Sequence, residues 1–230
     1  MSSRALHAVV LPVEPGGGRF LDLLSGALDG SGPAILPVDP ALPRGRIADL
    51  LNVFAPAAIE TTDGTKRLPA APPLVPASSA AGDSAARPRS AGSGAAGSSA
   101  ADGVDPDVAV VVATSGSTGV PKGVQLTAAA LRASAAASLD RIGAGPAARP
   151  GGRWLCCLPP FHVAGLQVLV RSMIAGTSPV VTDGVDAATV AGCGCAYVSL
   201  VPTQLRRLLD SRAAVDAFDA ILLGGAAPPA

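Results

Sequence analysis

Residues 108–124 read VAVVVATSGSTGVPKGV, and this passage determines the fold that we expect for the chain. Its first five residues form a continuous valine-rich apolar run, which is typical of a strand buried on both faces of a parallel sheet. A loop rich in Gly, Ser and Thr follows directly, and a helical pattern begins near Ala128. The passage therefore predicts a strand, a loop and a helix in succession, which is the repeating unit of an α/β protein.

The same alternation continues on both sides of this passage. Further apolar runs of strand length occur at 8–11, 154–158, 179–182, 196–201 and 220–223. Helical patterns occur at 20–28, 46–54, 128–142, 163–175 and 203–209. Strands that alternate with helices imply right-handed crossovers, so the sequence predicts a layered α/β sheet structure.

Composition divides the chain into three zones. Residues 1–76 have a mixed composition, whereas residues 77–103 are almost entirely Ala, Ser, Gly, Asp and Pro. A segment of that kind buries too little apolar surface to offset its loss of conformational entropy, so we interpret 77–103 as a flexible insertion. Residues 104–230 carry the clear strand and helix pattern.

Charge and hydropathy exclude several classes of partner. The chain has 17 basic and 17 acidic side chains, so no basic excess favours binding to a nucleic acid or an anionic membrane. No secretory pattern occurs at the N-terminus, and no apolar run approaches the length of a membrane-spanning helix. We expect a cytoplasmic protein without membrane insertion, whose partner is a small molecule. The sequence predicts no oligomeric state.

The four cysteines lack the spacing of a metal site. They occur as Cys156-Cys157 and Cys193-Gly194-Cys195, without the two-residue spacer of a zinc knuckle or a thioredoxin-like site. Cysteines inside an apolar run behave as small hydrophobic residues. We therefore expect reduced, buried thiols and no metal ligands.

The loop after the valine-rich run has the chemistry of a polyphosphate site. Glycines let backbone N–H groups turn toward one point, and hydroxyl side chains add further donors. Lys122 supplies a compact positive charge in a chain whose only other lysine is Lys66. Lys122 precedes Gly123 rather than Ser or Thr, so the loop is not a nucleotide-hydrolase P-loop. The phosphate-binding candidates are Thr114, Ser115, Gly116, Ser117, Thr118, Gly119 and Lys122.

This loop resembles the phosphate-binding signature of the adenylate-forming superfamily, which includes the acyl- and aryl-CoA ligases. The resemblance implies a layered αβαβα-type N-terminal domain, of which this chain would be an incomplete part. It also implies ATP, Mg²⁺ and coenzyme A as cofactor and co-substrates. In the implied reaction a carboxylate attacks the α-phosphate of ATP, pyrophosphate leaves, and a thiol then displaces AMP. Lys122 would grip the phosphates during the first step.

The segment Pro159–Gly165 also resembles the superfamily. It implies that His162 lies where the acid pocket meets the nucleotide, as a catalytic or substrate-binding residue, although a His at a helix start is often only structural. Gln167 and Arg171 are four residues apart, so they share a helix face. That face is either solvated or buried, and a buried Arg171 would need an anion such as a second carboxylate of the substrate. His162 and Arg171 can share a pocket only if the helix begins after His162.

The last motifs point to a subgroup of the superfamily. Ser199–Leu205 ends a strand and starts a helix, and together with the histidine segment it resembles the o-succinylbenzoate–CoA ligases of menaquinone biosynthesis. Thr203 becomes a substrate-binding candidate on that basis. The alternative is that Thr203 and Gln204 only start the helix and have no role in binding. The glycine-rich turn after Leu223 makes Gly225 and Ala226 candidates for the adenine side of the nucleotide site.

Three alternatives stay open from the sequence. The acid could be a fatty acid or another aryl acid, and the chain could be a non-catalytic nucleotide-binding fragment. An unrelated nucleotide hydrolase is the third. The segments that the superfamily places after this point, including its catalytic Lys, are not in the 230 residues. We therefore expect weak or no adenylation by this chain alone.

Overall fold

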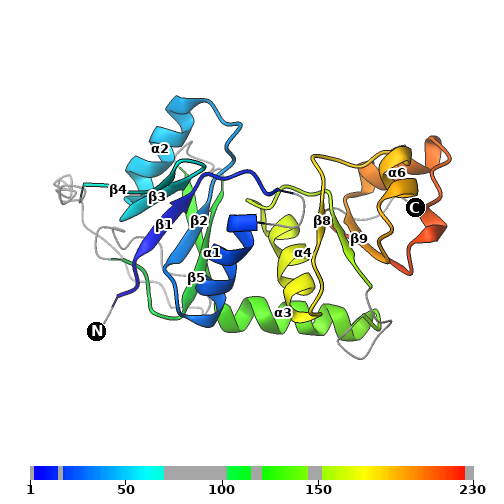
Figure 1. Ribbon diagram of the computed structural model, residues 1–230, viewed down its shortest axis with the longest axis horizontal. Coiled ribbons are helices and arrows are strands. Elements are labelled where there is room, and N and C mark those ends of the chain that lie inside the picture. The colour runs from blue at the N-terminus through cyan, green and yellow to red at the C-terminus, as the bar shows by residue number, and fades with distance from the viewer. Residues whose placement is uncertain (1–2, 15–17, 70–102, 115–120, 145–151, 226–230) are drawn as a thin grey trace, which may run out of the picture.

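The computed structural model describes residues 3–14, 18–69, 103–114, 121–144 and 152–225. Within this part the chain forms two sheets with helices between and outside them (Figure 1). The insertion at 77–103 lies outside the described residues except for Gly103.

The first sheet has the strand order β4-β3-β1-β2-β5-β6. Its strands are Leu6–Val9 (β1), Ala34–Pro37 (β2), Ala58–Thr61 (β3), Gly64–Arg67 (β4), Val108–Thr114 (β5) and Lys122–Thr127 (β6). β1, β2, β3 and β5 run parallel, whereas β4 and β6 at the two edges are antiparallel to their neighbours. Strands from the first and third zones of the sequence thus pair in one sheet, through β2 and β5.

The second sheet is parallel and has the strand order β10-β9-β7-β8. Its strands are Trp154–Cys156 (β7), Val180–Val181 (β8), Tyr197–Leu200 (β9) and Ala220–Leu223 (β10). The helices are Gly18–Asp29 (α1), Arg44–Phe54 (α2), Ala128–Arg141 (α3), Val163–Ile174 (α4), Ala187–Gly192 (α5) and Pro202–Asp210 (α6), with a 3-10 turn at Val215–Ala217.

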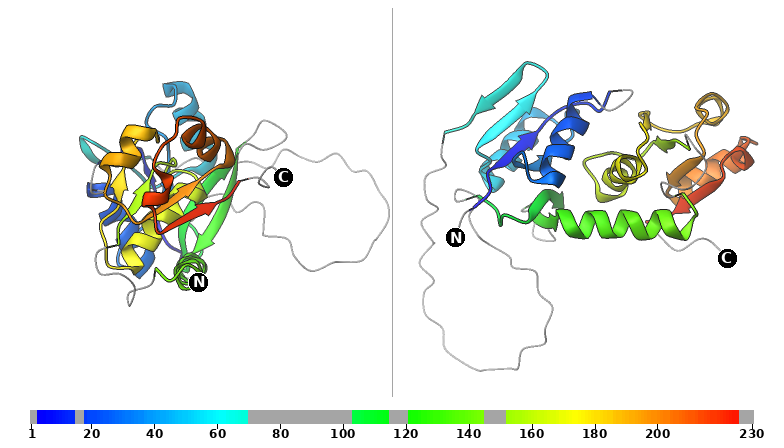
Figure 2. Two further views of the ribbon diagram at one scale, coloured as in Figure 1. Left: turned by 90° about the vertical axis from the view of Figure 1, so that its right-hand side faces the viewer. Right: turned by 60° about the horizontal axis from the view of Figure 1, so that its bottom comes forward.

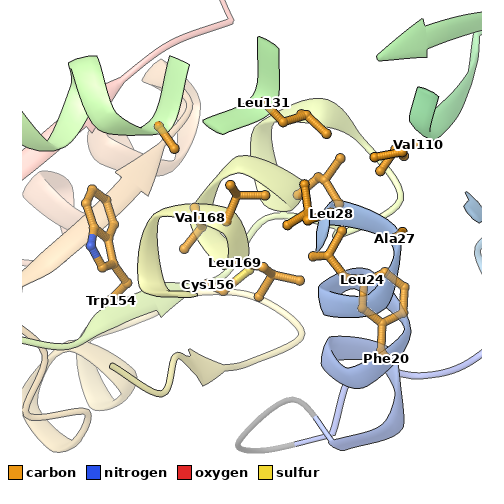
Figure 3. Close-up of a cluster of buried hydrophobic side chains, with 14 of the residues drawn as sticks. Phe20, Leu24, Ala27, Leu28, Val110, Leu131, Trp154, Cys156, Val168 and Leu169 are labelled. Atoms are coloured by element: carbon orange, nitrogen blue, oxygen red, sulfur yellow. The ribbon is translucent and has the colours of Figure 1, made fainter. Parts of the chain in front are cut away.

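Three separate hydrophobic clusters show that the two sheets and their helices form five layers. One cluster lies between the sheets and joins α1, α3 and α4 to both of them (Figure 3). A second cluster lies between the first sheet and α2, and a third lies between the second sheet and α5 with α6. α3 extends lengthwise from the first sheet to the second in Figure 1 and in the right-hand view of Figure 2. The order α, β, α, β, α confirms the predicted fold class.

The valine-rich strand β5 illustrates why the sequence favours this arrangement. Val110 and Val112 belong to the cluster between the sheets, whereas Val108 and Val111 belong to the cluster under α2. A strand with a helix layer on each face has no position for an exposed polar side chain, so its sequence is continuously apolar.

β2, the β3–β4 hairpin, β6 and α5 were not predicted from the sequence. β2 has only four residues and ends at Pro37, and the prolines that follow it indicated a loop instead. The β3–β4 hairpin and α5 are short, and β4 is largely exposed, so their hydrophobic patterns are weak. β6 is antiparallel and has four successive exposed residues because it is an edge strand. Its sequence therefore shows no alternation for pattern analysis to detect.

Three of the four cysteines are buried as predicted, whereas Cys193 is half-buried. All four are free, and Cys156, Cys157 and Cys195 are buried. Burial raises the pKa of Cys156 to about 12 and that of Cys157 to about 11, so both thiols are protonated at neutral pH. They pack as small apolar side chains in two different clusters.

Gly123 in β6 allows α2 to pack against the sheet, and this contact predicts a stability effect. A Cβ atom at Gly123 would lie 2.6 Å from Cε1 of Phe54 and 2.9 Å from Cγ1 of Val111. We expect Gly123→Ala to lower the free energy of unfolding by about 1–3 kcal/mol, because both neighbours are buried and must shift. Denaturant unfolding followed by circular dichroism measures this change.

The matched control is Gly45→Ala in α2. Gly45 is exposed, and nothing lies within 4 Å of its Cβ position. Alanine favours the helix by about 1 kcal/mol or less, so this variant should be as stable as the wild type or slightly more so. Equal losses of stability in the two variants would contradict the role of Gly123.

Candidate functional site

The strands of the second sheet end at a common edge, and several predicted site residues follow them there. Because β7, β9 and β10 are parallel, the loop before α4, the start of α6 and the turn at Gly225 all lie at their carboxyl ends. Gly225 has a φ of +92°, and a Cβ atom there would lie 3.3 Å from Cγ1 of Val201. Only glycine fits this turn without strain. The nucleotide contact of Gly225 stays a prediction, and Ala226 lies outside the described residues.

The predicted phosphate loop joins β5 to β6. Thr114 and Lys122 are paired at the ends of these antiparallel strands, and Oγ1 of Thr114 donates a hydrogen bond of 3.2 Å to the carbonyl oxygen of Lys122. Both residues are exposed, so the Lys122 ammonium is accessible to a ligand. Ser115, Gly116, Ser117, Thr118 and Gly119 lie outside the described residues.

His162 is the residue immediately before the first turn of α4. Its carbonyl oxygen accepts the first helical hydrogen bond, from the N–H of Leu166 at 2.9 Å, and its extended backbone ends the loop from β7. The imidazole is exposed and makes no capping hydrogen bond. The helix therefore begins after His162, which is the condition that the sequence set for a pocket shared with Arg171. A contact between His162 and a substrate stays a prediction.

Arg171 is buried, with 8% of its surface exposed, so the solvated alternative for its helix face is wrong. Nη1 donates a hydrogen bond of 3.1 Å to Oγ of Ser199 in β9. The guanidinium carbon lies 5.2 Å from the ring centroid of Trp154 in β7. Nε has no hydrogen-bond partner in the described part of the chain. Burial lowers the pKa of Arg171, and no acidic group among the described residues offsets this effect.

Gln167 is also buried, and its contacts differ from those of Arg171. Its Nε2 donates a hydrogen bond of 3.5 Å to the carbonyl oxygen of Leu131 in α3. Its Oε1 and Oγ of the buried Ser172 have no hydrogen-bond partner among the residues described. A shared helix face was predicted and its burial was left open; both residues are buried, but Gln167 contacts α3 whereas Arg171 contacts the second sheet. A substrate contact of Gln167 stays a prediction.

Thr203 and Gln204, both at the start of α6, differ in their contacts. Oε1 of Gln204 accepts a hydrogen bond of 3.1 Å from the N–H of Val201, and its Nε2 lies 3.4 Å from the carbonyl oxygen of Cys157. This confirms Gln204 as a helix-start residue. Thr203 is exposed in the first turn, so it is accessible to a ligand, and its predicted role is untested.

Sequence analysis missed Ser199 and Trp154 as neighbours of Arg171. Ser199 is the one serine in the apolar run 196–201, and Trp154 is the only tryptophan of the chain. Both were assigned to strands without a role, because the contact depends on how α4 packs on the sheet. An isolated serine in a buried strand was the signal that could have identified this position.

The described ranges contain no group of three or more His, Cys, Asp or Glu side chains that could hold a metal ion. None of their helices is long and apolar enough to cross a membrane.

The sequence of the chain is similar to those of known proteins. The family model described as AMP-binding enzyme matches residues 26–230. A probable 2-succinylbenzoate–CoA ligase of Mycobacterium tuberculosis is 50% identical over 138 residues, which are 55% of this chain and 34% of that protein. The 2-succinylbenzoate–CoA ligase of Escherichia coli is 34% identical over 198 residues, which are 86% of this chain and 39% of that protein. The chain thus spans little more than a third of the length of these relatives.

Solved structures show the same fold. Wild-type E. coli MenE with a bound analogue of OSB-AMS has 29% identity and a TM-score of 0.63, and the match covers 99% of this chain and 45% of that one. The o-succinylbenzoate CoA synthetase of Bacillus subtilis, in complex with OSB-AMP, has 21% identity and a TM-score of 0.65, with 99% and 57% covered. The second likeness supports the fold alone.

Proposed function

Because this chain belongs to the AMP-binding enzyme family, we propose that it forms the acid- and nucleotide-binding part of an ATP-dependent carboxylate–CoA ligase. In the proposed reaction a carboxylate oxygen attacks the α-phosphorus of ATP, the bond to the β-phosphate oxygen breaks, and pyrophosphate leaves. The sulfur of coenzyme A then attacks the acyl carbon and AMP leaves. The protein's part is to align the acid and to neutralise the charge that develops on the phosphates.

The acid that we propose is 2-succinylbenzoate, which carries two carboxylates and is a precursor in menaquinone biosynthesis, a cytoplasmic pathway. One observation carries this choice: Arg171 is a buried cation without an acidic partner in the described part of the chain. A buried, unpaired charge is unfavourable, so we expect a ligand to supply the anion that Arg171 lacks. The relatives named above have this acid in their names.

The proposed roles follow from position. Thr114, Lys122 and the five loop residues between 115 and 119 would hold the phosphates, whereas Gly225 and Ala226 would lie against the adenine. His162, Gln167 and Thr203 would line the acid site together with Arg171. Mg²⁺ would enter with the phosphates of ATP, because the described residues provide no acidic cluster for it. The division of the chain into the zones 1–76, 77–103 and 104–230 stays a prediction. In it, the first and third zones belong to one AMP-binding domain.

Ligand binding tests the proposal directly. Isothermal titration calorimetry of the purified chain should detect ATP with Mg²⁺ and 2-succinylbenzoate, and 3-benzoylpropanoate should bind more weakly. The latter is the same keto acid without the ring carboxylate. Equal affinity for both acids, or preference for a fatty acid, would contradict the choice of substrate. Absence of ATP binding would contradict the role of the nucleotide site.

A lysine pair tests the phosphate loop. We expect Lys122→Ala to weaken ATP binding about tenfold, because the ammonium group sits at the base of the loop and meets phosphate oxygens as a point charge. Lys66→Ala is the matched control: Lys66 is the only other lysine and is exposed in β4. It should bind ATP as the wild type does. Equal affinities in the two variants, measured by calorimetry, would exclude Lys122 from the phosphate site.

A further inference from the structure

Trp154 is a buried aromatic surface directly beside the Arg171 guanidinium. It is fully buried, with 0% of its surface exposed, and it lies beside α4 at one end of the cluster between the sheets (Figure 3). Its ring centroid lies 5.3 Å from that of Tyr197, at an interplanar angle of 39°. Tyr197 is its partner in the register of β7 and β9. The indole thus packs against its strand neighbour, and its Nε1 makes no hydrogen bond among the described residues.

Two contacts restrain the guanidinium in different ways. The indole ring of Trp154, 5.2 Å from the guanidinium carbon, attracts a cation through its π electrons, and indole does so better than other side chains. Ser199 accepts a hydrogen bond from Nη1 and so restricts the direction in which the group points. Nε is buried and has no partner in the ranges described, so part of the donor set stays available.

Without these contacts the Arg171 side chain would not be expected to remain buried. Long basic side chains bury their methylene groups and extend their charge toward water when they can. No acidic group in the described part of the chain holds the charge in place. A side chain that is already ordered before the ligand arrives loses less entropy on binding.

We propose that Trp154 is a positioning residue, which with Ser199 holds the Arg171 guanidinium ready for a second carboxylate of the substrate. This inference rests on the proposed function and extends it to residues outside the first contact with the acid. It predicts that changes at Trp154 weaken binding of a dicarboxylic acid selectively, although Trp154 itself does not contact the acid.

Calorimetry on three variants tests this selectivity. In Trp154→Leu we expect affinity for 2-succinylbenzoate to fall about tenfold, and affinity for 3-benzoylpropanoate to stay within about twofold of the wild type. Trp154→Phe keeps an aromatic face and should recover most of the loss. Ser199→Ala, a small change at a buried position, should show the same selective loss. ATP binding and circular dichroism verify that each variant is folded.

The outcomes separate this inference from the proposed function. If Trp154→Leu does not fold, Ser199→Ala still decides the question through the ratio of the two affinities. A wild-type ratio in Trp154→Leu or in Ser199→Ala, or equal losses for both acids, overturns the positioning role. If the wild-type chain does not distinguish the two acids, the proposed substrate is wrong and the inference fails with it.

Intrinsic fluorescence gives an independent reading. Trp154 is the only tryptophan of the chain. When the chain is excited at wavelengths that tyrosine does not absorb, its fluorescence emission therefore reports on the surroundings of Trp154 alone. We expect saturable change in that emission with 2-succinylbenzoate in the wild type and no change with 3-benzoylpropanoate. The dissociation constant from fluorescence should equal that from calorimetry. Binding without any change in emission would overturn the contact between Trp154 and the ligand-bound guanidinium.

Discussion

An Arg171→Leu variant is expected to bind 2-succinylbenzoate at least about a hundredfold more weakly than the wild type. Removing one partner of a buried, hydrogen-bonded charge pair costs about 2–5 kcal/mol, and here the carboxylate would be left without its cation. Affinity for 3-benzoylpropanoate should change by less than about threefold, because that acid has no second carboxylate. Calorimetry with both acids measures the two constants on the same preparation.

Stability distinguishes this role from a structural one. In the ligand-free chain Arg171 is buried with an unpartnered Nε and without an acidic neighbour in the part described, so its charge is a burden on the fold. Leucine fills the space without a charge, and we expect the melting temperature of Arg171→Leu to equal or exceed that of the wild type.

The matched control is Arg206→Leu in α6. Arg206 is exposed and pairs with Asp210 at 3.0 Å on the surface, so its loss should change neither affinity and should change stability only slightly. A lower melting temperature for Arg171→Leu with both acids bound equally well would contradict the proposed role, since Arg171 would then be a structural residue.

Most helices and strands could be predicted because each carries its own local signal. α4 was expected at 163–175 and is observed at Val163–Ile174, and β10 was expected and observed at Ala220–Leu223. Both are apolar segments bounded by turn residues, so short-range patterns suffice to locate them. Edge elements such as β6 carry no such pattern, because neither face of the strand is consistently buried.

The candidate site was less predictable than the fold. The sequence identified Arg171 through the physical argument that a buried charge needs an anion, but it left open whether the residue was buried. That question depends on α4 lying between the two sheets, which is a long-range property. Trp154 and Ser199 reach Arg171 from neighbouring strands, 17 and 28 residues away in the chain. No local pattern encodes such a contact.

Gly165→Ala is expected to have the largest effect on stability of the substitutions considered. Gly165 lies in the first turn of α4, and a Cβ atom there would lie 2.3 Å from the carbonyl oxygen of Pro159 and 2.4 Å from that of Leu158. These are backbone atoms of the loop that follows β7, so they cannot rotate away as a side chain would. We expect a loss of at least about 3 kcal/mol in the free energy of unfolding, measured by denaturant titration.

The same substitution at Gly192, the last residue of α5, is the control. Nothing lies within 4 Å of its Cβ position, so Gly192→Ala should unfold as the wild type does. The Gly165 variant should also lose affinity for both acids. α4 can accept the extra carbon only by moving away from the loop after β7, and this movement would displace Arg171 relative to His162. A stable Gly165→Ala variant with wild-type affinity would mean that α4 does not need this close approach, and the geometry proposed for the acid site would lose its foundation.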